Sequence, residues 1–377
     1  MTKHLYTTLT LFFLLFSGTD CRKNNNIIPP NNGVDTSSHN FTFTTYTFGG
    51  QAGSSLFRDV AIVNDSDIWA VGIIYVADTN VNGYTMYNAA HWDGNGWTLE
   101  SIMFPLCDEN GNQQGSGPYT ANGIFPFSSD DIWISCDVSL VHWNGENFEP
   151  VCMPLGYSQR NLGKMWGANG QIYLIGTNGF IAKYSTGSWT KLSSGTGLDL
   201  GDIYSKDGKE IYAVGGDPHT NDGILLKGDN DTWQTLEEGK NIDDTSQIFH
   251  PYFSGVASIV WVDGNNTVYF GASLLYEYVS GKCDFVKTLP GNYLYGNSYG
   301  QYRGVINKMR GNAGNDMVIA GDRNTLQHFN GSSWQQLGMP YDVNSNYDWL
   351  SVDMKNNTIA AAGFYNGSAV VMILKRR

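Results

Sequence analysis

A short motif recurs along this chain and decides what the chain can fold into. The motif is an apolar run that ends in glycine, followed by a glycine-containing turn between two aromatic residues. The first copy reads IWAVG at residues 68–72 and HWDGNGW at residues 91–97. Related apolar runs stand at residues 132–134, 172–176, 211–215, 268–271, 317–321 and 359–363. Seven copies of one unit predict a repeat fold.

The spacing of the copies identifies the kind of repeat. Trp133, Tyr173 and Tyr212 hold equivalent positions about 40 residues apart, and insertions lengthen the other steps. A unit of this length accommodates the four short strands of a propeller blade. In the third copy we expect strands at residues 162–166, 171–175, 180–184 and 188–192, with a hairpin turn at Asn169-Gly170. We therefore predict an all-β fold, a seven-bladed β-propeller of four-stranded antiparallel blades.

The last copy lacks one strand. It supplies residues 349–354, 358–363 and 369–374 before the chain stops at Arg377. A β-like segment at residues 40–48, with aromatic residues among threonines, precedes the first copy and has no other partner. We predict that this segment is the outer strand of the last blade, where it closes the ring and covers a sheet edge.

Composition fits one exported domain at residues 40–377. The chain has 45 glycines and only 15% charged residues, which indicates a surface of turns and neutral polar groups. A propeller grows by adding blades, so the length is compatible with a single domain, which we expect to be monomeric. The formal net charge of −13 argues against nucleic acid as a partner.

The N-terminus has the order of an export signal. Residues 1–20 place Lys3 before an apolar stretch and then small residues, and the stretch is too short for a permanent membrane anchor. Cys21 stands where a bacterial lipoprotein signal places the residue that becomes lipidated. Residues 21–39, rich in Asn, Pro and Ser, predict a disordered tether. We expect an outer-membrane or cell-surface lipoprotein that meets the membrane through its lipid only, or a periplasmic or secreted protein if Cys21 is not lipidated.

Four cysteines remain: Cys107, Cys136, Cys152 and Cys283. In an oxidising compartment Cys152 can pair with Cys107 or with Cys136, and the sequence leaves the choice open. The spacing matches no zinc site, and we expect neither a metal nor a cofactor.

Extra chain length falls at connections that share one face of a propeller. We expect tight turns between first and second strands and between third and fourth strands. Long loops are expected at residues 75–87, 107–119, 215–222, 237–254, 290–301 and 340–347. The candidate ligand-binding residues there are His250, Tyr252, Tyr293, Tyr295 and Tyr302. Tyrosine beside small polar residues suits recognition of sugars or peptides, although long loops also need aromatic rings for their own packing.

Three arginines stand at the entry to an innermost strand: Arg58, Arg160 and Arg303. At equivalent positions they would approach the axis together and form a cationic centre for a carboxylate-bearing ligand. Alternatively, each pairs with a neighbouring carboxylate such as Asp59 or Asp202 and stabilises the rim.

The recurring aromatic residues predict a core rather than a site, because each blade must bury a face against its neighbour. On third strands these are Trp92, Trp143, Tyr184, Tyr278 and Phe329, and on fourth strands Trp97, Trp189, Trp233 and Trp334.

The turns WDGNGWT at residues 92–98 and NGSSW at residues 330–334 resemble the Asp-box-like and Kelch-like turns of secreted bacterial propellers, including sialidase-like repeats. The resemblance spans residues 41–375 and implies architecture. The Arg-Ile-Pro segment of sialidases does not occur, and neither does the Kelch double-glycine signature outside Gly215-Gly216, so no activity is transferred.

Function is predicted as binding. The sequence contains no nucleophile elbow, P-loop or metalloprotease motif. We expect a propeller that binds a glycan or an envelope protein through its long-loop face. One alternative is a polysaccharide-degrading hydrolase or lyase that uses His250 or loop carboxylates such as Asp243, Asp244 and Asp342. Another is a scaffold in an envelope complex.

Overall fold

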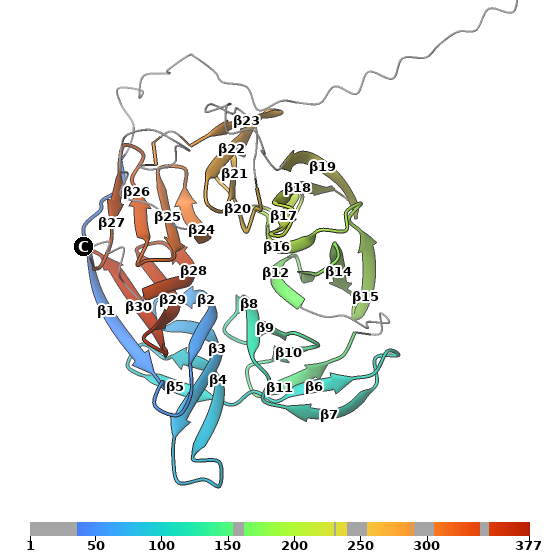
Figure 1. The fold of residues 1–377 in the computed structure, drawn as a ribbon, viewed down its shortest axis with the longest axis vertical. Coiled ribbons are helices and arrows are strands. Elements are labelled where there is room, and N and C mark those ends of the chain that lie inside the picture. The colour runs from blue at the N-terminus through green and yellow to red at the C-terminus, as the bar shows by residue number, and fades with distance from the viewer. Residues whose placement is uncertain are drawn as a thin grey trace, which may run out of the picture.

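The computed structural model describes residues 36–153, 162–229, 231–239, 255–286, 288–289, 305–339 and 347–377. Within these ranges the chain forms seven four-stranded antiparallel sheets arranged around a common axis, as Figure 1 shows. The predicted seven-bladed β-propeller is therefore confirmed. In this part of the chain no helix is long and apolar enough to cross a membrane.

Blades 1 to 3 follow one another along the chain. Blade 1 comprises β2 (Leu56–Asn64), β3 (Asp67–Ala77), β4 (Tyr84–Trp92) and β5 (Trp97–Glu100). A separate hairpin, β6 (Phe104–Cys107) and β7 (Gln113–Gly117), precedes blade 2. Blade 2 comprises β8 (Ala121–Ser128), β9 (Asp131–Cys136), β10 (Leu140–Trp143) and β11 (Phe148–Val151). Blade 3 comprises β12 (Leu162–Ala168), β13 (Gln171–Gly176), β14 (Phe180–Ser185) and β15 (Ser188–Ser193), which confirms the four strands expected there.

Blades 4 to 7 complete the ring. Blade 4 comprises β16 (Asp199–Tyr204), β17 (Ile211–Asp217), β18 (Asp222–Asp229) and β19 (Thr232–Gly239). Blade 5 comprises β20 (Ile259–Val262), β21 (Val268–Gly271), β22 (Leu275–Val279) and β23 (Lys282–Phe285). Blade 6 comprises β24 (Ile306–Ala313), β25 (Asp316–Gly321), β26 (Leu326–Phe329) and β27 (Trp334–Gln336). Blade 7 comprises β28 (Tyr347–Lys355), β29 (Thr358–Tyr365), β30 (Ser368–Arg376) and β1 (Phe41–Phe48).

The ring closes as predicted. β1 pairs antiparallel with β30 along its whole length, from Phe41 opposite Arg376 to Phe48 opposite Ala369. One blade is thus built from both ends of the described chain, and opening the ring requires breaking this ladder. The predicted strand at residues 40–48 matches the observed one within one residue.

The glycine that ends the apolar run is required by the approach of the first strand to the second. A Cβ atom on Gly72 would lie 2.1 Å from the carbonyl oxygen of Leu56, and one on Gly215 would lie 2.0 Å from that of Asp199. Gly363 has the same relation to Asp348. Any side chain here would collide with backbone that belongs to the same sheet, so the motif needs glycine.

The hydrophobic core lies between neighbouring blades. Phe329, Trp233 and Trp334 are buried, whereas most of the other predicted core rings are half-buried and pack on the rim of a core cluster. The most deeply buried aromatic residues lie elsewhere, for example Trp261 on β20 and Trp349 on β28. The prediction of a packing role holds, but several of the most deeply buried aromatic residues are ones that the repeat did not single out.

Two blades share a polar motif at the start of the second strand. In blade 1 the Trp69 indole N–H donates to Asp67 Oδ1 at 3.0 Å, and His91 Nε2 lies 2.9 Å from the same oxygen. The His91 ring stacks on Trp69 with centroids 4.1 Å apart. Asp131, Trp133 and His142 repeat the arrangement in blade 2. The His-Trp pairs of the repeat thus tie the second and third strands of a blade together.

A related cluster in blade 6 holds the closing strands in place. His328 Nε2 lies 2.8 Å from Asp316 Oδ1, and Arg376 of β30 donates to both oxygens of the same carboxylate. His39, just before β1, places Nδ1 2.8 Å from His328 Nδ1. Burial raises the pKa of Asp316, but the hydrogen bonds from His328 and Arg376 outweigh it and hold the pKa well below its ordinary value.

Cys107 and Cys152 form a disulfide, one of the two pairings left open above. It attaches the β6–β7 hairpin to the end of blade 2, and Cys136 is free and buried. Three expected loops are corrected here. Residues 107–119 contain β7, and within residues 75–87 the strands β3 and β4 continue, which leaves only residues 78–83 as a connection. Within residues 215–222 the strands β17 and β18 continue in the same way, which leaves only residues 218–221. All three segments pair as hairpins because neighbouring strands satisfy each other's backbone groups.

Candidate binding sites

Most of the predicted site residues lie outside the described residues: Cys21, Arg160, His250, Tyr252, Tyr293, Tyr295, Tyr302 and Arg303. Arg58 is described and exposed on β2. Asp59, which could have paired with it, instead forms an ion pair with Lys164 at 3.1 Å. Tyr75 and Tyr84, expected in a loop, instead lie on β3 and β4 and pack on one another with ring centroids 5.1 Å apart.

Charged side chains meet at the axis where the innermost strands bulge. β2 bulges between Phe57 and Asp59, β16 between Leu200 and Asp202, and β24 between Ile306 and Lys308. A β-bulge re-aims the residue that follows it. We call the six charged residues around this centre the axial cluster: Asp59, Lys164, Asp202, Lys308, Arg310 and Asp353.

The axial cluster is held by short polar contacts. Lys308 Nζ lies 2.6 Å from Asp202 Oδ1, and Arg310 NH1 lies 3.5 Å from Asp202 Oδ2. Asp59 accepts from the Ser351 hydroxyl at 2.6 Å. The Arg310 guanidinium also lies over the Tyr204 ring, 4.9 Å from its centroid, which is within cation–π range.

Burial and charge act in opposite directions on these groups. Burial raises the pKa of Asp202, but Lys308 and Arg310 outweigh it and hold the pKa below its ordinary value. Burial, assisted by Arg310, lowers the pKa of Lys308 to about 8. Asp353 differs, because burial dominates there and raises its pKa despite hydrogen bonds from the Ile62 and Met354 amides.

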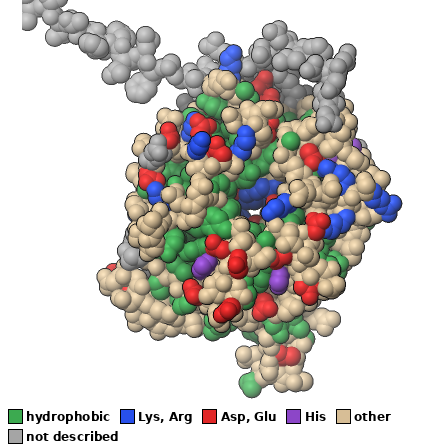
Figure 2. Space-filling view, turned by 180° about the vertical axis from the view of Figure 1, so that it is seen from behind, with side chains coloured by type: hydrophobic (Ala, Val, Ile, Leu, Met, Phe, Trp, Pro, Cys, Tyr) green, Lys and Arg blue, Asp and Glu red, His purple; other side chains and the backbone are tan. Residues whose placement is uncertain are grey.

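The axial cluster contains three acidic and three basic side chains, so it is balanced in charge. A cavity of about 230 Å³ adjoins it, lined by Asp59, Tyr204, Lys308, Arg310, Asp353 and Lys355 among others. Figure 2 shows Lys and Arg side chains around the hollow at the centre of the ring. A ligand entering here would meet donors and acceptors already engaged with one another, which favours a structural role for the cluster.

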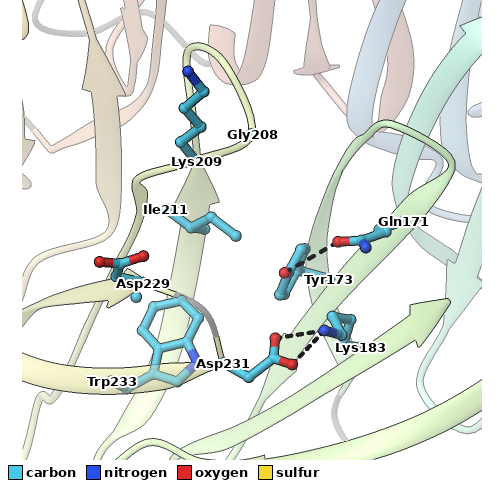
Figure 3. A pocket seen from close by; sticks show the side chains of 10 residues that line it. Gln171, Tyr173, Lys183, Gly208, Lys209, Ile211, Asp229, Asp231 and Trp233 are labelled. Atoms are coloured by element: carbon cyan, nitrogen blue, oxygen red, sulfur yellow. Dashed lines mark hydrogen bonds and ion pairs between the residues drawn. The ribbon is translucent and has the colours of Figure 1, made fainter.

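A larger cavity, of about 460 Å³, lies between blades 3 and 4, and we call it the interblade cavity (Figure 3). Blade 3 contributes Gln171, Tyr173 and Lys183 to the lining. The other lining residues come from blade 4: Gly208, Lys209, Ile211, Gly228, Asp229, Asp231 and Trp233. Its size is in the range of small-molecule sites.

Two polar pairs border the interblade cavity. Lys183 Nζ lies 2.6 Å from Asp231 Oδ1 across the blade boundary, and the Tyr173 hydroxyl donates to Gln171 Oε1 at 3.4 Å. Burial and the nearby Asp231 charge raise the pKa of Tyr173 to about 12. The phenol therefore keeps its proton at neutral pH and remains a donor.

Neither place was predicted from the sequence. Asp59 and Asp202 were expected only as partners for arginines, and Lys164, Lys308 and Lys183 had no predicted role. In the described ranges no group of three or more His, Cys, Asp or Glu side chains is placed to hold a metal ion.

Comparison with known proteins reveals similarity of fold alone. No protein-family model and no curated protein matches the sequence. Among solved structures, YCF48 bound to D1 peptide superposes with a TM-score of 0.58 at 13% identity, covering 91% of this chain and 99% of that chain. The WD40 β-propeller domain of Doa1 gives 0.57 at 13% identity, covering 90% and 98%. A catalytically inactive virginiamycin B lyase from Staphylococcus aureus with quinupristin gives 0.55 at 10% identity, covering 89% and 100%. This chain is thus similar in architecture to β-propellers of several kinds.

Proposed function

We propose that this protein is an exported, lipid-anchored β-propeller that binds a glycan or protein ligand at the cell envelope through the face that carries its long connections. The fold leaves the function open, since propellers host many activities. The proposal therefore rests on which connections between strands are short and which are long.

The observation that carries the proposal is the asymmetry between the two faces. First and second strands are joined by two-residue turns in several blades, for example residues 65–66, 169–170 and 356–357. By contrast, the connection from β19 to β20 occupies residues 240–258, and that from β23 to β24 occupies residues 286–305. All blade-to-blade connections lie on the same face of a propeller. Long segments gathered on one face of a rigid scaffold are typical of a binding surface.

Similar structures are compatible with this role. One is bound to a peptide and another is described with quinupristin, so proteins of similar architecture bind ligands. The export signal predicted at residues 1–20 and the lipidation predicted at Cys21 support the cellular placement, because an anchor of this kind would keep the ring at the envelope.

A glycan array tests the ligand. The full chain is compared with the triple variant Arg58→Ala, Arg160→Ala, Arg303→Ala, which removes the proposed cationic centre. A control variant, Lys206→Ala, Lys282→Ala, Lys375→Ala, removes the same charge at positions that line neither cavity. We expect the wild type and the control to bind acidic glycans without releasing product, and the arginine variant to lose binding. Folded protein that binds no glycan and enriches no envelope protein in a pull-down would overturn the proposal.

Membrane fractionation tests the anchor. The full chain should partition with membranes and carry a lipid by mass spectrometry, whereas Cys21→Ala should be released in soluble form. An unmodified Cys21 in the wild-type protein would refute lipid anchoring and leave the ligand proposal standing.

A further inference from the structure

Blade 4 departs from the repeat at one position. In five blades the first residue of the apolar run pairs across the sheet with an aromatic residue of the third strand. These aromatic partners are Trp92, Trp143, Tyr184, Tyr278 and Phe329. In blade 4 the corresponding residue, Ile211, pairs with Gly228. The third-strand ring is therefore missing from blade 4.

In other blades this ring covers an aromatic residue of the preceding blade. The Tyr184 ring of blade 3 lies 5.0 Å from that of Trp133 in blade 2, and the Trp143 ring of blade 2 lies 6.4 Å from that of Trp69 in blade 1. The residue to be covered in blade 3 is Tyr173, and Gly228 has no ring to place on it. The vacancy opens beside Tyr173, where the interblade cavity lies.

Trp233 takes up part of the vacated space. A Cβ atom on Gly228 would lie 2.9 Å from Trp233 Cε2, so the indole lies directly against the glycine. Even so, the cavity of about 460 Å³ remains. Unfilled volume between strands forfeits packing energy, which makes a cavity of this size unusual in a repeat in which five other third strands supply a ring and the sixth, in blade 7, supplies Leu374.

The lining selects the ligand. The Tyr173 and Trp233 rings offer apolar contact. Lys209 and Asp229, whose side chains have no partner among the described residues, offer a donor and an acceptor beside the Lys183–Asp231 ion pair. The four charged residues of the lining, two lysines and two aspartates, cancel. A neutral ligand with an apolar face and a rim of hydroxyl groups matches this combination, because each hydroxyl can donate to a carboxylate and accept from an ammonium group. We propose that the interblade cavity is a binding site for a single neutral sugar ring.

This site is separate from the face proposed above for ligand binding. Gly208 belongs to the turn between β16 and β17, and Asp231 to the turn between β18 and β19. In a propeller these turns lie on the face opposite the blade-to-blade connections. Binding in the interblade cavity therefore does not depend on Arg58 or on the long connections, and the two proposals can fail independently.

Saturation-transfer NMR with the full chain tests the site, using the methyl glycosides of glucose, galactose, mannose and N-acetylglucosamine as probes. We expect at least one to bind, with affinity at least tenfold weaker in Lys183→Met and in Asp231→Asn. Asparagine is chosen because residue 231 has a φ of 68°, which asparagine tolerates. Lys227→Met is the matched control: Lys227 holds the register position in blade 4 that Lys183 holds in blade 3, and its ion pair with Glu210 lies outside the cavity lining.

The outcomes separate clearly. Sugar binding that survives in the Arg58, Arg160, Arg303 triple variant and in Lys227→Met but weakens in the two cavity variants supports the site. Absence of binding to all four glycosides by folded wild-type protein overturns it, as does binding that Lys183→Met and Asp231→Asn leave unchanged. N-acetyltryptophanamide is included as a competitor, and its binding in place of every sugar would also overturn the proposed ligand class.

Discussion

Replacing Asp202 by asparagine tests whether the axial cluster holds the ring together. Asp202 is 1% exposed, and its carboxylate faces Lys308 and Arg310 while accepting the Val260 amide at 3.1 Å. The substitution keeps the shape but removes the negative charge. Two acidic and three basic groups then remain at the axis, and one buried positive charge has no counterpart.

Breaking a buried ion pair from one side costs about 3–5 kcal/mol, because the partner stays buried and unpaired. For a large domain, at roughly 2 °C per kcal/mol, this corresponds to a decrease in Tm of about 6–10 °C. Differential scanning calorimetry at pH 7 measures it. The double variant Asp202→Asn, Lys308→Met restores charge balance and should recover most of the loss. Asp353→Asn should cost much less, because burial raises the pKa of that carboxyl, so the fold stabilises its charge less than it stabilises that of Asp202.

A Tm for Asp202→Asn within 2 °C of wild type would refute the reasoning. A double variant no more stable than the single one would refute it as well, since the loss would then come from something other than unpaired charge.

Three further predictions concern the ring itself. Gly215→Ala should lower the free energy of unfolding, measured by urea titration, by about 2 kcal/mol or more, since its Cβ would lie 2.0 Å from a carbonyl oxygen. Gly197 has open space around it, so Gly197→Ala should leave the free energy of unfolding nearly unchanged. Removing the Cys107–Cys152 disulfide by serine substitution should cost up to about 4 kcal/mol by chain entropy for a separation of 45 residues, with faster hydrogen exchange concentrated in the β6–β7 hairpin; uniform acceleration would contradict this. Asp316→Asn should destabilise the protein at pH 7. Because the folded pKa of Asp316 is depressed, its contribution is present above the unfolded pKa of about 4 and disappears as the pH falls further, so a stability difference that persists unchanged to pH 2 would count against it.

The sequence predicted the ring and its closure because the repeat carries local information. The aromatic pairs and the Asn-Gly turns define strands and hairpins within a few residues, as in blade 3. The strand at residues 40–48 could be placed because counting strands left one blade incomplete. The pairing of β1 with β30, which are far apart in sequence, could therefore be predicted by elimination.

The candidate sites were harder to predict from the sequence, because they depend on strand register and on which side chains face the axis. The arginine at residue 58 and the aspartate at residue 59 are neighbours in sequence, yet a β-bulge between Phe57 and Asp59 decides that Asp59 meets Lys164. A shift of one residue moves a side chain to the other face of a strand, and the sequence gives no sign of where the bulge falls. The pairing of Cys107 with Cys152 was also open, because the sequence does not show which cysteines the fold brings together.

By itself, the sequence determined the number of blades, the strand content and the strand that closes the ring, because these follow from periodicity and short-range turn chemistry. Only the tertiary structure decided which charges meet at the axis and that the glycine at residue 228 leaves a cavity between blades 3 and 4. Both depend on side chains contributed by different blades, and the distance between such side chains is set by how the blades pack around the axis.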